Sequence, residues 1–141
     1  PETMGKVNQL GTLEEVLTLC RLDERILPCI DFGHLNARTF GSLNTAAAFA
    51  EIFEKMENEI GTDRMRMFHS HFSKIAYTIP GGEKCHLTFA DTEFGPEFEP
   101  VAELIVKKGC TPTIICESAG TQAEDAAAMK ELYLTAGGNI T

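Results

Sequence analysis

The sequence predicts an α/β fold built on a parallel sheet, because short apolar segments bounded by turn residues alternate with segments of helical spacing. The composition, 141 residues with 43% hydrophobic and 23% charged, suits a single domain over residues 1–141. Three whole strands and the exit of a fourth cannot close a barrel, but such parallel (β/α) units would form half of an eight-stranded barrel. A small open, doubly wound sheet is the rival fold, although the Gly-rich phosphate turn that usually follows its first strand is missing.

Local signals predict the order of the elements along the chain. Thr12 and Glu15 are spaced as a capping box, which opens the first expected helix, and Gly61 suits the end of the second. Turn residues at 80–82 mark an excursion, expected to be a hairpin, that interrupts the strand-to-helix rhythm. The expected elements are a strand exit (1–6), a helix (13–23), a strand (26–31), a long helix (44–60), an alternating strand (65–75), the excursion (76–89), a helix (100–108), a strand (112–118) and a helix after a second capping box at Thr121 and Glu124.

Composition narrows the classes of protein that the chain could be. The five cysteines are odd in number and without a C-x-x-C pair, which argues against a disulfide framework and against a zinc ribbon. Cys29 and Cys116 are expected to be small core residues. The formal net charge of −9 argues mildly against a broad nucleic-acid surface. Because no apolar run reaches membrane length and no signal segment is recognised, we expect a cytoplasmic protein with no membrane partner.

Side chains with metal-binding chemistry stand at the end of each expected strand. The carboxyl ends of parallel strands meet at one edge of the sheet, and active sites of parallel α/β folds lie at that edge. Carboxylates and imidazoles together suit zinc, manganese or iron(II). The candidate ligands are Glu2, Asp31, His34, His69, His71 and Glu117.

Each candidate also has an ordinary structural explanation. Asp31 could cap the segment after its strand, with His34 as a loop histidine. His69 and His71 alternate with phenylalanines, so either could be a core histidine. Glu117 ends a wholly apolar strand and should be at least half-buried, where a charge needs a cation or close hydrogen-bond donors. The weakest candidates, both in the excursion, are Cys85 and His86.

Five blocks of sequence in a fixed order carry a resemblance to a known family. They are PETMGK with QLGTLEE, PCIDFGHLNAR, HSHFSKI, GGEKCHLTF and IICES. Together they resemble the second half of endonuclease IV, the metal-dependent AP endonuclease family of the xylose-isomerase-like TIM barrels, over essentially the whole chain. The resemblance implies the C-terminal half of a (β/α)8 barrel, with the N-terminal half absent. It also implies a three-zinc hydrolase, with manganese possible, that cuts DNA on the 5′ side of abasic sites and leaves a 3′-hydroxyl.

The resemblance further implies a role for each candidate ligand. Glu2 and Glu117 would each help to hold more than one metal ion, and Glu117 could also orient the attacking water as the catalytic residue. The remaining ligands would be Asp31, His34, His69 (with His71 as the alternative) and His86.

Two departures from the family pattern limit the comparison. The family has Asp-x-His in the loop that holds His86, whereas Lys84 stands here at the acidic position, so one ligand is missing unless Glu83 substitutes. The family's first half, with its own histidine ligands, is absent from these 141 residues. We therefore expect this chain by itself to bind metal poorly and to cleave nothing.

Two other functions compete with the nuclease. A sugar isomerase or epimerase of the same superfamily would use one divalent metal held by Glu2, Asp31, a histidine and Glu117, and would have no need of His86. A non-catalytic half-barrel would associate with itself to cover its open sheet edges, and such self-association is expected whichever function holds.

Overall fold

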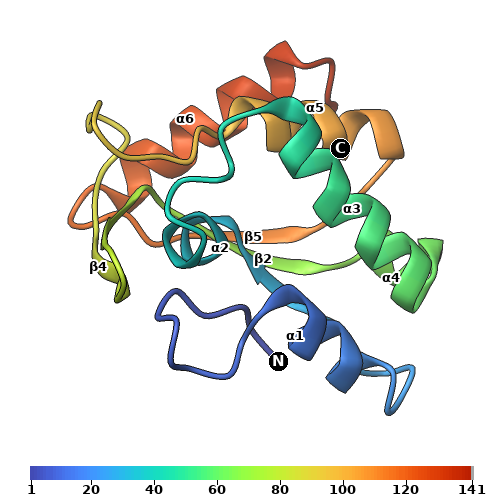
Figure 1. Cartoon of the computed structure of the whole chain (residues 1–141). Coiled ribbons are helices and arrows are strands. Elements are labelled where there is room, and N and C mark those ends of the chain that lie inside the picture. The colour runs from blue at the N-terminus through green and yellow to red at the C-terminus, as the bar shows by residue number, and fades with distance from the viewer. Residues whose placement is uncertain (141) are drawn as a thin grey trace.

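The computed structural model describes residues 1–140, with a parallel three-stranded sheet at the centre (Figure 1). The strands lie in the order β1 (Cys29–Asp31), β2 (His69–Phe72) and β5 (Thr113–Cys116). In the register, Asp31 pairs with His71. The prediction of a parallel α/β fold is therefore confirmed at this level.

The first residues of the chain run parallel to β1 and pair with it. Glu2 forms a parallel bridge with Cys29. The amide of Thr3 donates to the carbonyl of Cys29 at 3.0 Å, and the amide of Cys29 donates to the carbonyl of Pro1 at 2.8 Å. This short pairing fixes Glu2 at the same edge of the sheet as the end of β1.

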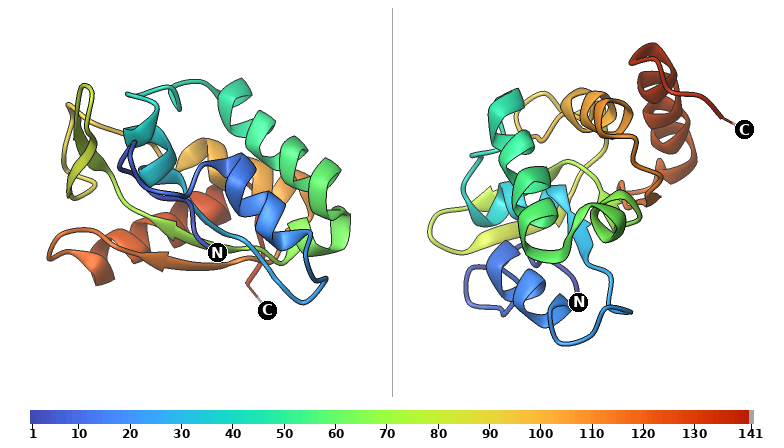
Figure 2. Two further views of the ribbon diagram at one scale, coloured as in Figure 1. Left: turned by 60° about the horizontal axis from the view of Figure 1, so that its bottom comes forward. Right: turned by 90° about the vertical axis from the view of Figure 1, so that its right-hand side faces the viewer.

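The helices lie mainly on one side of the sheet, where α3, α5 and α6 run above the strands in Figure 1. Both views of Figure 2 place the antiparallel hairpin of β3 and β4 at one margin of the molecule. The remaining elements are α1 (Leu13–Cys20), α2 (Phe32–Arg38), α3 (Ala46–Ile60), α4 (Thr62–Arg66), β3 (Ile75–Thr78), β4 (Gly82–His86), α5 (Glu99–Lys108) and α6 (Gln122–Thr135).

A cluster of aromatic rings forms the centre of the core between the sheet and the helices. The ring of Phe32, at the start of α2, lies 5.9 to 6.4 Å from its four phenylalanine neighbours, and all five side chains are buried. Rings at this separation gain both area burial and favourable quadrupole geometry. This packing holds α2 and β2, which carry His34, His69 and His71. The neighbours are Phe49, Phe53, Phe68 and Phe72.

Three local expectations are wrong, each for a physical reason. His34 lies in α2 rather than in a loop, because the side chain of Asp31 caps a short helix that follows β1 directly. The alternating segment is not all strand, since Met65 lies in α4 and is buried in the core. Thr121 makes no capping bond to the backbone of α6, because its hydroxyl donates to Asp125 at 2.8 Å instead. The capping box of Thr12 and Glu15 is present as expected.

Two further observations concern the cysteines and the length of the helices. All five thiols are free, but Cys29 and Cys116 are half-buried rather than core residues, because they sit on strands with one incompletely covered face. Across residues 1–140, no helix has the length and apolar character needed to cross a bilayer.

Candidate metal centre

Asp31 and Thr3 position the ligands at the end of β1. The Oδ1 atom of Asp31 accepts a hydrogen bond of 2.7 Å from the amide of His34, which starts α2 and places the imidazole one turn along. The hydroxyl of Thr3 donates to the carbonyl of Asp31 at 3.2 Å and accepts from its amide at 2.8 Å. These bonds align residues 1–3 with β1 and position Glu2 near Asp31, at the end of that strand.

Four side chains meet there and are called the carboxylate set: Glu2, Asp31, His71 and Glu117. The Nδ1 atom of His71 lies 3.0 Å from Oε1 of Glu2 and 3.4 Å from Oε1 of Glu117. Ligand atoms of Asp31, His71 and Glu117 lie within 4.8 Å of one another. Three carboxylates and one imidazole at this spacing form a hard-to-borderline ligand set for a divalent metal.

The carboxylate of Asp31 is the most deeply buried group of the carboxylate set. The side chain is 0% exposed, and its Oδ2 atom accepts no hydrogen bond from any residue in 1–140. Burial, helped by the charges of Glu117 and Glu2, raises the pKa of Asp31 to about 6 despite the lowering effect of His34. The one polar group that faces Oδ2 is Nδ1 of His34, at 3.2 Å. A buried carboxylate beside two more carboxylates is costly unless further positive charge is present, so the residues fit a metal ion.

Three further residues, His34, Glu83 and His86, form the histidine–glutamate set. The Nδ1 atom of His34 lies 2.9 Å from the carbonyl oxygen of Thr3, which can only accept, so Nδ1 carries the proton. The Nε2 atom, on the other side of the ring, lies 3.5 Å from Oε2 of Glu83. This nitrogen is free to bind a metal.

His86 is oriented in the same manner from the opposite side. Its Nδ1 atom is hydrogen-bonded to the hydroxyl of Ser73 at 2.8 Å, and its Nε2 atom lies 3.9 Å from Oε1 of Glu83. Ligand atoms of His34, Glu83 and His86 lie within 4.8 Å of one another. Metal-binding histidines typically hold one ring nitrogen in a protein hydrogen bond and offer the other to the metal. Both histidines of this set follow that rule.

The two candidate histidines of β2 have different neighbours. His71, the alternative, contacts Glu2 and Glu117, whereas His69 lies one step back along the strand, beside Cys29. The reason is register: Asp31 pairs with His71, so His71 is level with the end of β1. In this arrangement His71, the alternative candidate, contacts the carboxylates, whereas His69 as a metal ligand stays a prediction.

Glu83 is the candidate for the acidic ligand that the family pattern leaves missing at Lys84. Glu83 lies between the two histidines, and Lys84 is not part of the set. Sequence reasoning placed His86 in a solvated excursion, but strand β4 brings it back against α2, where its ring lies 5.6 Å from that of His34. The supporting roles of Thr3 and Ser73 were not predicted, because they depend on contacts between distant segments.

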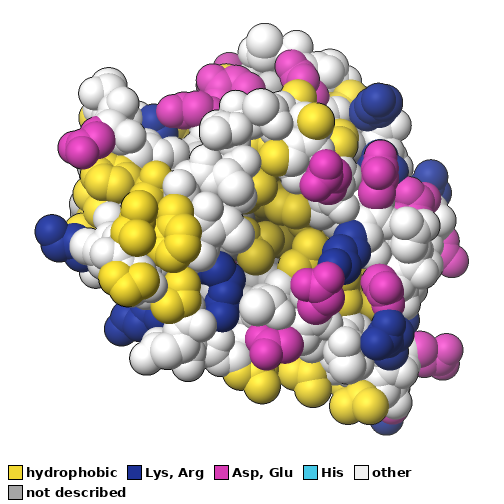
Figure 3. Space-filling model, viewed as in Figure 1, with side chains coloured by type: hydrophobic (Ala, Val, Ile, Leu, Met, Phe, Trp, Pro, Cys, Tyr) yellow, Lys and Arg dark blue, Asp and Glu magenta, His cyan; other side chains and the backbone are white. Residues whose placement is uncertain are grey.

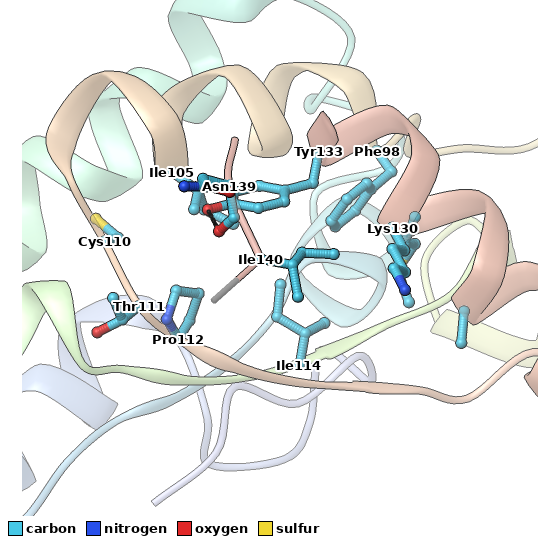
Figure 4. Close-up of a pocket in the computed structure, with 12 residues that line it drawn as sticks. Phe98, Ile105, Cys110, Thr111, Pro112, Ile114, Lys130, Tyr133, Asn139 and Ile140 are labelled. Atoms are coloured by element: carbon cyan, nitrogen blue, oxygen red, sulfur yellow. Dashed lines mark hydrogen bonds between the residues drawn. The ribbon is translucent and has the colours of Figure 1, made fainter. Parts of the chain in front are cut away.

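The larger cavities lie away from both sets. A cavity of about 430 Å³ lies between α5, α6 and β5, where Phe98, Ile114 and Tyr133 contribute to an apolar lining (Figure 4). Another, of about 570 Å³, lies between α1, α2 and α3, in the region of the hydrophobic hollow seen in Figure 3. Neither is lined by a residue of the two ligand sets, so both cavities are separate from the candidate ligands.

Comparison with known proteins identifies one relative but no described family. No family model matches the chain. A protein of Methanocaldococcus jannaschii, described as uncharacterized, is 40% identical over 118 residues, which cover 84% of this chain. The same match covers 42% of the relative, so the chain spans less than half the length of this curated relative. The relative's description states no activity that could be transferred.

Proposed function

We propose that this chain forms the metal-binding, C-terminal half of a (β/α)8-barrel phosphodiester hydrolase of the endonuclease IV type, which cleaves DNA on the 5′ side of abasic sites. The observation that carries the proposal is the presence of two adjoining ligand sets. Asp31 belongs to the carboxylate set, and His34, which its side chain caps, belongs to the histidine–glutamate set. Neighbouring metal ions that share an active site are typical of enzymes that cut phosphodiesters.

The histidine–glutamate set favours the hydrolase over the isomerase. A single-metal sugar isomerase needs the carboxylate set alone. The second set would serve no purpose there, yet His34 and His86 each present Nε2 towards Glu83. That both are held by hydrogen bonds through Nδ1 supports a second bound metal.

In the proposed reaction, the two ligand sets of this chain would hold zinc, or manganese, at the edge of the sheet. Bound metal ions would neutralise charge on the phosphodiester and make a water molecule nucleophilic at neutral pH. The Glu117 side chain is 32% exposed, so its carboxylate can accept a hydrogen bond from that water and orient it. Buried Asp31 contributes fixed negative charge that favours cation binding.

A second candidate function rests on the completeness of the carboxylate set. Glu2, Asp31, His71 and Glu117 would by themselves hold one divalent metal, and the two glutamates could then serve as acid and base for a sugar isomerase or epimerase. The two functions differ in the number of metals required and in whether Glu83 matters for activity.

An incision assay on the longer archaeal relative tests the proposed activity. We expect the zinc-loaded relative to cut a duplex carrying one abasic site on its 5′ side, and we expect its variant with glutamine at the position matching Glu117 to lose this activity. The 141-residue chain, tested in parallel, is expected to bind metal through its own two sets, more weakly than the relative does, and to leave the duplex intact. A relative that leaves abasic DNA intact but interconverts aldose and ketose sugars would overturn the nuclease proposal in favour of the isomerase.

A further inference from the structure

A third group of potential ligands lies on the same sheet as the carboxylate set, nearer the first residues of β1 and β2. Ligand atoms of Cys29, His69 and His71 lie within 4.8 Å of one another. All three side chains are half-buried, so the group is neither sealed in the core nor a loose surface cluster. Cys29 and His69 have no part in the proposed hydrolytic centre.

The sheet itself dictates this arrangement. Cys29 and His69 are paired directly across the parallel register of β1 and β2. His71 lies two residues beyond His69, so strand alternation returns it to the same face. The two imidazole rings are 5.2 Å apart and nearly perpendicular, with an interplanar angle of 78°. The two paired strands therefore do not have to move for the three ligand atoms to converge.

We propose that Cys29, His69 and His71 form a separate metal site for a borderline or soft cation of the zinc class. A thiolate with two imidazoles is a ligand set that selects Zn²⁺ or Co²⁺ and disfavours Mg²⁺ and Ca²⁺, which prefer oxygen ligands. Three protein ligands leave one tetrahedral position for water or for a group from another segment. The carboxylate set, with its three oxygen donors, is a harder ligand set and selects less strongly against Mg²⁺.

This site goes beyond the proposed hydrolase and does not depend on it. His71 is common to both sets, so the thiolate site is expected to communicate with the carboxylate set. Cys29 distinguishes the two, because a sulfur ligand gives bound Co²⁺ a thiolate-to-metal charge-transfer absorption in the near ultraviolet that oxygen and nitrogen ligands do not produce.

Titration of the reduced, metal-free chain with Co²⁺ alone tests the proposal. We expect the charge-transfer band to appear in the wild type and in Cys85→Ser, whose exposed thiol lies outside the group, and to be absent in Cys29→Ser. His69→Gln should weaken the Co²⁺ affinity reported by the band by about 100-fold, since loss of even an outer-shell partner costs 10–100-fold. Glu83→Gln should retain the band, which separates this result from any failure of the hydrolase proposal.

A chemical measurement on the unmutated chain keeps the test valid if Cys29→Ser does not fold. Saturating Co²⁺ should slow alkylation of Cys29 by at least tenfold, measured by peptide mass spectrometry, while alkylation of Cys85 proceeds at its metal-free rate. A Co²⁺-saturated protein without the band, a band that survives Cys29→Ser, or equal Cys29 alkylation with and without Co²⁺ would each overturn the proposal.

Discussion

Replacing Asp31 with asparagine should stabilise the metal-free protein while removing its main metal ligand. The substitution keeps an Oδ1 atom to accept the bond from the amide of His34, so the cap of α2 is retained. It also removes a buried charge whose Oδ2 atom lacks a hydrogen-bond partner within residues 1–140. The same carboxylate that suits a cation is therefore a cost to folding when no cation is bound.

The size of the effect follows from the pKa of Asp31. Burial raises this pKa from 3.8 to about 6, and at about 1.4 kcal/mol for each tenfold change the native state loses up to about 3 kcal/mol at neutral pH. For a domain of this size, that loss corresponds to roughly 10 °C in Tm. Because the folded-state pKa lies above the unfolded one, the penalty is absent below about pH 4, grows between about pH 4 and pH 6, and is complete above.

Thermal unfolding in EDTA from pH 3.5 to 8, followed by circular dichroism, measures this effect. We expect Asp31→Asn and wild type to converge at the acid end, and the variant to melt higher above pH 6; added Zn²⁺ should raise the Tm of the wild type more than that of the variant. Asp125→Asn is the matched control. Burial would raise the pKa of Asp125, but hydrogen bonds from Phe89, Ser118 and Thr121 lower it, so this variant should be destabilised. A metal-free Asp31→Asn protein that melts below wild type at pH 7, or a difference that does not vary with pH, would refute the reasoning.

Three further predictions concern the second ligand set, the packing of α2 and the open sheet edge. Glu83→Gln should weaken binding of one metal ion by tenfold or more in calorimetric titrations, because the shared carboxylate between two imidazoles loses its charge; an unchanged titration would count against that set. Gly33→Ala should lower the free energy of unfolding in urea by about 1–3 kcal/mol, since its Cβ would lie 2.5 Å from the carbonyl oxygen of Ser73, and an equally stable variant would contradict this close packing. Ile115→Lys should reduce self-association measured by light scattering, because Ile115 is an apolar, 46% exposed residue on edge strand β5; a wild-type chain that is monomeric at high concentration would refute the expectation.

The general placement of the ligands could be predicted because it depends on local pattern and one topological rule. Apolar runs ending in Asp31 and Glu117 predict strands whose ends carry carboxylates, and parallel strands gather their ends at one edge. Glu2 could be placed there for the same reason, and it forms a parallel bridge with Cys29. The capping box at Thr12 and Glu15 was predictable because both partners lie within one turn.

The details that failed depend on contacts between distant segments. An alternating pattern puts His69 and His71 on one face, but which of them is level with Asp31 depends on the register between β1 and β2. Helix α2 is only seven residues long and contains Gly33, so its local preference is weak; burial of Phe32 against the other rings stabilises it instead. The sequence could have indicated that Cys29 lies beside the ligands, because it stands two residues before Asp31 in a strand and so shares its face.

Native mass spectrometry of the Cys29→Ser chain, reconstituted with Zn²⁺ after chelation, tests the central claim most directly. This background removes the thiolate ligand, so only the carboxylate set and the histidine–glutamate set remain to be counted. The account predicts one zinc ion in each set, and the loss of one of them on adding Glu83→Gln. A chain that retains no zinc, or that retains a single ion whether or not Glu83 is replaced, would contradict the claim that these residues form a centre for neighbouring metal ions.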